Sequence, residues 1–390
     1  RCLAGKMPTP RAASSAARRG VCLVCCCCLV AHCTALARPA RLRIGEVKQR
    51  LARFGVSTAG IVEADELRAL LARCPPEASG PGHAVPLERV RASDGTMGSG
   101  VAVYDKAYYS VRLELTAAAP ERASRVQWVL DSAASNSLVT PDAAALLEAR
   151  NTGVTATADT ASTTGAGGFQ QVDLGVASLA GGLTSGPLRP VVMELPVAGE
   201  RGLLGLDFLN NHDVDLRLRP ASPCAIFYEA GSAARGDIDT SGLAELTCAR
   251  LPSGLMATPV KLTTDDEAGE VTMLAVVDLG SPLTLCNWAA ASAMGLSRED
   301  PRVRLTDDVI AGASGDPIRV SEARLTLDAG GARRAALLVN IADLPVFSAI
   351  GLPGAAAVLG LDALAPSAEL ESGSRVLLAA RDMRVWVEEE

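Results

Sequence analysis

Three short motifs of this chain occur twice, in the same order and at nearly constant spacing. The segment 129–135 (VLDSAAS) is matched by 276–281 (VVDLGS), which places Asp278 147 residues after Asp131. A glycine-rich block and the tetrapeptide LGLD follow each copy, and they recur 147 and 155 residues further along the chain. An aspartate beside small residues is by itself a common turn signal, but three matched blocks indicate a duplication. We therefore expect two copies of one domain, each of about 120 residues.

The glycine-rich blocks predict turns. The first contains Gly165, Gly167 and Gly168, and the second contains Gly312 and Gly315. Because glycine adopts turn conformations without steric cost, each block is typical of a turn between two strands.

The LGLD blocks predict a strand that leads into a helix. Leu203 precedes the first block and Val358 precedes the second, so each block ends an apolar run. The apolar residues are typical of a core strand, and an acid at this position is typical of a helix start. Asp207 and Asp362 are therefore interpreted as helix caps or surface acids.

Beyond residue 100, apolar and polar residues alternate. Val172, Leu174 and Val176 follow this period of two, and similar runs recur towards the C-terminus. Alternation of this kind predicts strands with one buried face. The sequence therefore predicts a mainly β fold of two tandem lobes, at 101–230 and 255–390, with short helical interruptions.

The first 37 residues have the composition of a targeting segment. A basic stretch ends at Arg18-Arg19, an apolar run follows, and Ala35-Leu36-Ala37 fits a signal-peptidase site. We expect residues 1–37 to direct the chain into the secretory route, to be secreted or to reach a vacuole or plastid. The apolar run is at the low edge of a membrane span, which leaves an uncleaved signal anchor open.

Most of the cysteines belong to that segment. Seven of the eleven lie there, where they are interpreted as small apolar residues. The four others are Cys74, Cys224, Cys248 and Cys286. An exported chain can form disulfides, but the sequence does not define their pairing.

Charge and histidine content exclude several classes of function. Without the five basic residues of its first 37, the chain has 32 basic and 44 acidic residues and a net charge of −12. Such acidity argues against nucleic-acid binding. The only histidines are His32, His83 and His212, which argues against a histidine metal site or a Ser–His triad. We expect no cofactor and no metal.

Residues 42–74 predict a helical hairpin. Apolar residues recur at helical spacing on both sides of a turn that contains two glycines. The unit resembles the SAP-type hairpins, some of which bind DNA, although a spacer or docking role suits an acidic chain better. Residues 75–100 are rich in Pro, Gly and Ser and are predicted to be a linker. Whether residues 38–100 form a removable pro-segment is left open.

The order of the repeated blocks resembles that of the aspartic proteases, in particular the retropepsin-like ones, over roughly residues 104–390. The resemblance implies that each copy is one lobe of a pseudo-twofold pair. The Asp motif would form the catalytic turn, the glycine-rich hairpin a flap, and the apolar-apolar-Gly motif a support beneath the catalytic loop. Two fused lobes are similar to the pepsin plan, and flap tips without a tyrosine are similar to the retroviral one.

On this resemblance, Asp131 and Asp278 are the catalytic pair. Two carboxylates held face to face share one proton, so the ionised member can activate water while the protonated member polarises the scissile carbonyl. The other residues are assigned by position: an active-site loop of Ser132, Ala133, Ser135, Leu279, Gly280 and Ser281; flaps at Gly165, Gly167, Gly168, Gly312 and Gly315; and a supporting motif of Leu204, Gly205, Leu359 and Gly360.

Two positions depart from the family pattern of Asp, a hydroxyl residue and Gly. Ala133 replaces the glycine of the first copy, where its methyl group could crowd the interface or need an unusual backbone angle. Leu279 replaces the hydroxyl residue of the second copy, so only Ser132 can donate across the pair. Ser281 could hydrogen-bond Asp278, which predicts the lower pKa for Asp278 and leaves the shared proton on Asp131.

Two functions stay open at this stage. The first is an aspartic endopeptidase that acts at acidic pH on a peptide or protein substrate in extended conformation. The second is a degenerate lobe pair that binds peptides or partners without cleavage. The retention of both aspartates, both glycine-rich blocks and both supporting motifs favours the enzyme. A structural or adhesion module would require the repeat to be accidental. We expect a monomer without a membrane span in the mature chain.

Overall fold

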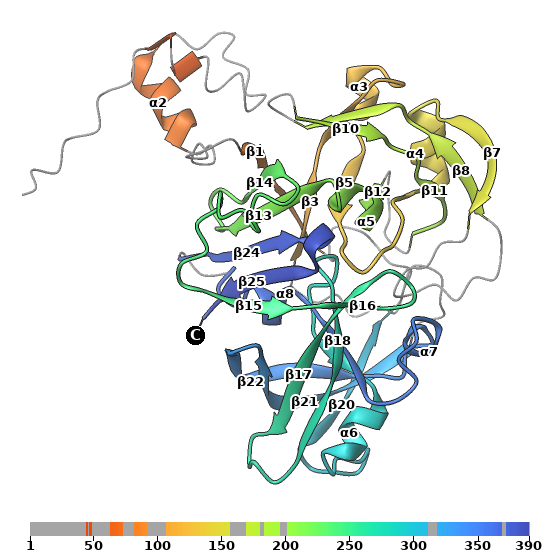
Figure 1. Cartoon of the computed structure of the whole chain (residues 1–390), viewed down its shortest axis with the longest axis vertical. Helices are drawn as coiled ribbons and strands as arrows, with labels where there is room; N and C mark the ends of the chain where they lie inside the picture. Colours follow the sequence, from red (N-terminus) through yellow and green to blue (C-terminus); the bar gives the residue numbers. More distant parts are fainter. Residues whose placement is uncertain are drawn as a thin grey trace, which may run out of the picture. The chain divides into compact units, whose positions relative to one another are not determined.

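The computed structural model describes residues 44–45, 47–48, 63–72, 82–91, 107–156, 169–179, 183–195, 201–310, 318–368 and 372–389. Most of the regular structure in these ranges is β-strand, as predicted (Figure 1). None of the helices in these ranges has the length and apolar character needed to cross a membrane. The predicted targeting segment lies outside the described residues.

Two eight-stranded sheets form the two lobes. In lobe 1 the strand order is β2 (Glu88–Arg91), β3 (Ala107–Val111), β5 (Gln127–Leu130), β12 (Arg201–Leu204), β6 (Leu138–Val139), β11 (Val191–Val192), β8 (Phe169–Asp173) and β7 (Arg150–Ala156). In lobe 2 it is β16 (Ala249–Arg250), β17 (Met256–Thr264), β18 (Glu270–Val277), β23 (Ala356–Leu359), β19 (Leu285–Cys286), β22 (Ala332–Ile341), β21 (Ile318–Ala329) and β20 (Val303–Ile310).

The two sheets have the same topology, strand for strand. Parallel pairs occur at the same two places, β5–β12 and β6–β11 in lobe 1 and β18–β23 and β19–β22 in lobe 2. The pairs around them are antiparallel in both lobes. The prediction of two tandem lobes is therefore confirmed.

Long strands of lobe 2 are divided in lobe 1. Strand β21 pairs with both β20 and β17 along its length. Its counterpart in lobe 1 is broken into β8 and β9 (Val176–Leu179), and β9 pairs with β4 (Leu113–Leu115) and β10 (Leu183–Pro187) in a small sheet. The break falls at Gly175, whose φ is +71°. A side chain there would also clash with Thr116, so the sequence requires glycine.

A six-stranded sheet joins the two copies. Its order is β1 (His83–Pro86), β14 (Cys224–Glu229), β13 (His212–Leu218), β24 (Ser374–Ala379), β25 (Arg384–Glu388) and β15 (Leu243–Thr247). The central strands β13 and β24 lie side by side and antiparallel, from the pair Asp213–Ala379 to Leu218–Ser374 (Figure 1). Across this junction, Arg375 donates hydrogen bonds of 2.8 and 2.9 Å to the buried carboxylate of Asp215.

This sheet changes the limits of the repeat. Each half contains a strand that precedes its lobe, β1 or β15, and a hairpin that follows it. Strands β1 and β2 lie within the predicted linker 75–100, and β15 and β16 lie before the predicted start of lobe 2 at residue 255. The Pro and Gly residues around β1 suggested a linker, but Val85 and Leu87 are buried and pack in the main core.

Short helices occupy equivalent places in the two lobes. Helices α4 (Pro141–Leu146) and α6 (Trp288–Ala293) begin 147 residues apart. Each is capped by a side chain that accepts a backbone hydrogen bond: Thr140 accepts from the N–H of Ala143, and Asn287 accepts from that of Ala290. Helices α5 (Leu206–Leu209) and α8 (Leu361–Leu364) form the other matched pair. The short elements α3 (Pro120–Ala123), α7 (Val346–Ala349) and η2 (Ala380–Asp382) complete the two lobes and the central sheet.

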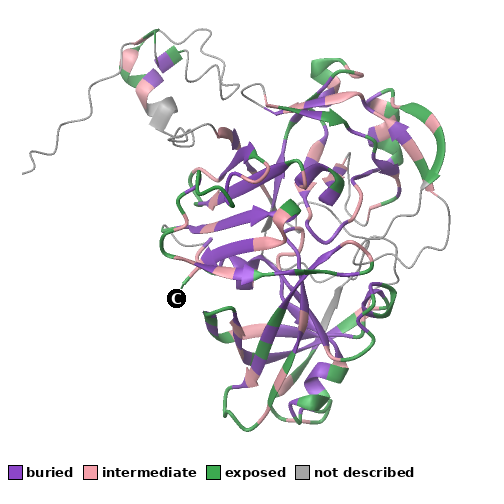
Figure 2. Ribbon diagram, viewed as in Figure 1, coloured by how far each residue is buried: buried purple, intermediate pink, exposed green. Residues whose placement is uncertain are grey.

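The core is continuous through both copies. Buried residues follow the strands of both lobes, as Figure 2 shows, and one apolar cluster extends from Val85 to Val387. Cys224, Cys248 and Cys286 are buried and free, and burial raises the pKa of each thiol, that of Cys224 to about 11. These cysteines therefore act as small apolar residues in the structure. Cys74 lies outside the described residues.

The predicted hairpin 42–74 is described only in part. Residues 44–45 and 47–48 are helical, and helix α2 spans Ala64–Ala72. The predicted turn between these helical segments lies outside the described residues, so the hairpin stays a prediction.

Candidate active site

Asp131 and Asp278 occupy the same position in their lobes. Each follows a strand that pairs in parallel with the strand of the LGLD block. The N–H of Asp131 donates to the carbonyl of Leu204, and the N–H of Asp278 donates to the carbonyl of Leu359, both at 3.0 Å. The duplicated sheet thus places both aspartates at the same end of equivalent strands.

Backbone N–H groups orient both carboxylates. The N–H of Ala133 donates to Oδ1 of Asp131 at 2.7 Å. In lobe 2, the N–H groups of Gly280 and Ser281 donate to Oδ1 of Asp278 at 2.8 and 3.0 Å. Because backbone groups make these bonds, the turns keep their geometry despite the different side chains of the two loops.

The two carboxyl groups lie in contact across the lobes. The side chains of Asp131 and Asp278 form a hydrogen bond with each other. A Cβ atom at Gly280 would lie 2.8 Å from Cγ of Asp131, which is closer than packed carbon atoms approach. The glycine is therefore required by this close approach, and the structure brings together the two residues that the repeat predicted to be paired.

Burial and mutual repulsion raise both pKa values. Burial raises the pKa of Asp131 from 3.8 to about 6. Burial and then the charge of Asp131 raise the pKa of Asp278 well above 3.8. The two groups are coupled and share one proton.

The predicted order of the two pKa values was based on a hydrogen bond that the structure does not contain. The prediction assumed that the Ser281 hydroxyl would hydrogen-bond Asp278. Instead, this hydroxyl donates to the carbonyl of Leu283 at 2.8 Å, and only the N–H of Ser281 reaches the carboxylate. The extra stabilisation expected for ionised Asp278 is missing.

Ser132 links the two catalytic loops. Its buried hydroxyl donates to the carbonyl of Val277 at 2.8 Å and accepts from the N–H of Leu279 at 3.0 Å. Leu279 has no hydroxyl to return the contact, and its side chain is packed in the core with 2% exposure. The link between the lobes is made from one side only, as the sequence predicted.

Ala133 is accommodated without backbone strain. Neither Ala133 nor Gly280 has a positive φ angle, so alanine adopts this backbone as readily as glycine. The side chain of Ala133 is 1% exposed and belongs to the main core. The unusual backbone angle considered for this position is therefore not present.

The supporting glycines lie against the catalytic loops. A Cβ atom at Gly205 would lie 2.7 Å from the carbonyl oxygen of Ala134, and one at Gly360 would lie 2.3 Å from that of Leu283. The residues that follow them are also equivalent, because Leu206 donates to Ala134 and Leu361 donates to Ser281, both at 2.8 Å. These contacts place the motif of Leu204, Gly205, Leu359 and Gly360 directly beside the loops.

Two pairs of polar side chains hold the supporting glycines in place. The sequence did not predict these pairs. In lobe 1, the hydroxyl of Ser137 donates to Asp207 at 2.7 Å and accepts from the N–H of Gly205 at 3.1 Å. In lobe 2, Thr284 donates to Asp362 at 2.6 Å and accepts from Gly360 at 3.1 Å.

The interpretation of Asp207 and Asp362 as caps or surface acids was therefore incomplete. Both acids lie in the first turn of a short helix, but each also anchors the loop that carries a candidate catalytic aspartate. The signal was available, since Ser137 and Thr284 are hydroxyl residues separated by the same 147 positions.

The flap residues Gly165, Gly167, Gly168, Gly312 and Gly315 lie outside the described residues. The strands on either side of each block are described, and they pair antiparallel as β7–β8 and β20–β21. Ser135, the remaining predicted loop residue, accepts a hydrogen bond from the side chain of Asn136 at 3.2 Å. In the described part of the chain, no group of three or more His, Cys, Asp or Glu residues could hold a metal ion.

Comparisons with known proteins find structural likeness, with 187 matching chains among the solved structures, but no matching sequence. No protein-family model matches the chain, and no curated protein sequence matches it. Among the solved structures, the basic 7S globulin from soybean is similar over 78% of this chain and 94% of its own, with 12% identity and a TM-score of 0.39. A likeness at this level carries no information about chemistry.

Proposed function

We propose that the chain is an aspartic endopeptidase that hydrolyses peptide bonds with a water molecule held by Asp131 and Asp278. The observation that carries the proposal is the hydrogen-bonded contact between two carboxyl groups from equivalent loops, one of them buried and the other half-buried. Bringing two acids together is unfavourable unless they share a proton. A purely structural role therefore does not explain this contact.

The shared proton gives the two aspartates different roles in this mechanism. The ionised member of the pair accepts a proton from the attacking water. The protonated member donates a hydrogen bond to the scissile carbonyl, which stabilises the negative charge that develops there. The proton taken from the water then passes to the leaving amine as the C–N bond breaks, and the pair returns to its starting state.

The remaining residues of the site hold this pair in place. The N–H groups of Ala133, Gly280 and Ser281 fix the carboxylates, and Ser132 sets the position of one loop relative to the other. We propose that the substrate binds in extended form and pairs as an added strand. No cofactor is needed for this chemistry.

A cleavage assay with purified protein and a denatured protein substrate, between about pH 3 and pH 7, tests the proposal. Asp131→Asn and Asp278→Asn should each reduce cleavage by about 10²- to 10⁴-fold, because each removes an acid or a base. Asp142→Asn is the matched control, since Asp142 is exposed on helix α4 and belongs to neither active-site loop. Cleavage that survives both active-site substitutions would rule out the mechanism.

A second function, peptide binding without cleavage, is favoured by one observation. The loop link is one-sided, because Leu279 offers only its N–H group to Ser132. If this leaves the carboxylates too loosely held for catalysis, the site still accepts an extended peptide. Calorimetry that detects peptide binding, together with mass spectrometry that finds no product, would support this function over the first.

We also propose that the chain enters the secretory route. The composition of residues 1–37 supports this, as a basic stretch precedes an apolar run that ends in small residues. N-terminal sequencing of protein from the producing cells tests it and also shows whether residues 38–100 are removed. A mature chain that begins upstream of residue 38 would point to the signal anchor instead.

A further inference from the structure

A cavity in lobe 2 has no part in the proposed hydrolysis. It has a volume of about 540 Å³ and is formed by the end of β17, by the start of β20 and by β21 and β22. Leu296, Leu325 and Leu338 give it an apolar lining, and three arginines with two acids give it a polar one. A volume of this size is within the range of about 300–1,000 Å³ that small-ligand sites occupy.

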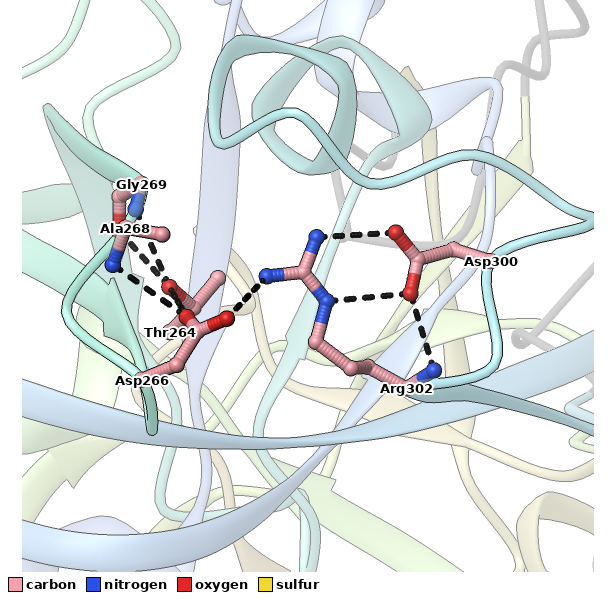
Figure 3. Close-up of polar contacts among 6 residues, drawn as sticks. All are labelled: Thr264, Asp266, Ala268, Gly269, Asp300 and Arg302. Atoms are coloured by element: carbon pink, nitrogen blue, oxygen red, sulfur yellow. Dashed lines mark hydrogen bonds and ion pairs between the residues drawn. The ribbon is translucent and has the colours of Figure 1, made fainter.

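Two of the three arginines are held by carboxylates. Arg302 lies between Asp266 and Asp300, with hydrogen bonds of 2.8 Å to the first and of 2.8 and 3.0 Å to the second (Figure 3). Arg304 is paired with Glu322, whose side chain is 3% exposed. Their charges are therefore largely neutralised by side chains of the protein.

The wall that carries Arg302 is fixed before any ligand arrives. The hydroxyl of Thr264 donates to Asp266 at 2.6 Å and accepts from the N–H of Gly269 at 3.0 Å, which closes the turn between β17 and β18 (Figure 3). The hydrogen bonds from Arg302 also lower the pKa of Asp300 to about 2, so this ion pair persists in acid. A preformed wall reduces the entropy that a ligand loses on binding.

Arg324 differs from the other two arginines. It lies on β21, two residues from Glu322, and it lines the same cavity. The partner that the structure gives it, within the described part of the chain, is the carbonyl of Ala336 at 3.4 Å. A guanidinium group has five N–H donors in a planar fork, so most of the donors of Arg324 are available to a ligand.

The charge around the cavity restricts the ligand further. Asp265, Asp266, Asp300 and Glu322 surround the arginines, so the acids near the cavity outnumber its cations. A dianion such as phosphate would be repelled by them. A single carboxylate can form a bidentate pair with Arg324 at a lower electrostatic cost. An apolar group attached to that carboxylate would be buried against Leu338, which is only partly covered by the protein.

We infer that this cavity binds the free C-terminal carboxylate of a peptide whose last side chain is apolar. The carboxylate pairs with Arg324, and the side chain packs on Leu338, which is the cross-strand neighbour of Arg324. The site is separate from the aspartate pair and does not depend on the proposed catalysis.

Titration calorimetry of the full chain with an acetylated Ala-Ala-Leu peptide tests the inference. The Asp131→Asn variant is used as the parent, so that binding is measured whether or not the protein is an enzyme. The peptide with a free carboxylate should bind, and the same peptide with a C-terminal amide should bind on the order of tenfold more weakly or not at all.

Two substitutions locate the binding. Arg324→Gln should weaken binding of the carboxylate peptide on the order of tenfold or more. Arg333→Gln is the matched control, because Arg333 is an exposed arginine of the same lobe that does not line the cavity. Absence of binding by the carboxylate peptide, equal binding by the amide, or equal loss in both variants would overturn the inference.

Discussion

The two lobes share one topology, yet their catalytic loops keep different halves of the same pattern. Lobe 1 retains the hydroxyl at Ser132 and has alanine at 133, whereas lobe 2 retains the glycine at 280 and has leucine at 279. Ser132 makes the side-chain contact between the loops, and Gly280 gives Asp131 the space it needs. A duplicated site can therefore divide its parts between the two copies. The linking hydroxyl and the small residue beside the carboxyl pair are each needed only once, because both lie at the shared interface.

The largest effect, a fall in kcat, is expected when the catalytic loop of lobe 2 is given the alanine that lobe 1 has at the equivalent position. In Gly280→Ala, the new methyl group would lie 2.8 Å from Cγ of Asp131 and would push the two carboxyl groups apart. A shift of about 1 Å in a reacting group costs on the order of 10²-fold in rate, so kcat should fall by at least that factor. Gly354→Ala is the control, because a Cβ atom there meets nothing within 4 Å. Parental kcat in Gly280→Ala would show that the close approach has no functional role.

The charge of the pair should reduce stability at neutral pH. Burial raises the pKa of Asp131 from 3.8 to about 6, so the folded state binds more protons than the unfolded state between these values. Stability is therefore lost as pH rises through this window, and Asp131→Asn should be more stable at pH 7 by about 3 kcal/mol. Below about pH 4 the difference should disappear. Urea unfolding at both pH values checks this, and identical curves at pH 7 would contradict the assigned pKa.

The one-sided link should make Ser132 matter more for stability than an ordinary hydroxyl. Ser132→Ala leaves the carbonyl of Val277 and the N–H of Leu279 without their partner in a buried place. This should lower the free energy of unfolding by about 1–3 kcal/mol. Ser124→Ala, which removes an exposed hydroxyl bonded to the carbonyl of Glu121, should change it by less than about 0.5 kcal/mol. Equal effects of both variants would mean that the link adds no stability.

Restoring the hydroxyl of lobe 2 tests whether the link can be made from either side. In Leu279→Thr, two new hydrogen bonds offset the lost apolar packing, so stability should change by no more than about 1 kcal/mol. The informative quantity is the coupling with Ser132→Ala, whose cost should be smaller in the Leu279→Thr background. A double-mutant cycle measured by urea unfolding provides it. Additive effects would show that the two positions do not substitute for each other.

The smallest effect is expected at Ala133. Because its φ angle is not positive, replacing it by glycine relieves no strain and only adds freedom to the unfolded chain. Ala133→Gly should therefore lower the free energy of unfolding by about 0.5–1 kcal/mol. A more stable Ala133→Gly variant in thermal unfolding would show that the methyl group crowds the interface after all.

The two lobes could be predicted from the sequence because a duplication leaves the same motifs at two places in the chain. The aspartates, the supporting glycines and the single-sided role of Ser132 all follow from matched positions. The sequence did not predict β1 and β15, since these short strands depend on partners far along the chain and their flanking Pro and Gly residues are typical of linkers. Likewise, Ser137 and Asp207 are 70 residues apart, and only the fold shows that they meet.

The contact made by the Ser281 hydroxyl was missed for a more local reason. The sequence shows that Ser281 has a hydroxyl, but its rotamer decides whether that group reaches Asp278. In the structure the hydroxyl turns to Leu283 and caps the loop instead. Side-chain direction within a tight turn depends on contacts that a motif does not contain.

The joined sheet also has a consequence for biosynthesis. Because β13 pairs with β24, and β25 pairs with β24 and β15, a nascent chain cannot complete its central layer until β24 and β25 have been made. During synthesis, β13 keeps an open edge that can pair with wrong partners. Loss of β24 and β25 would therefore leave unpaired strands in both halves together.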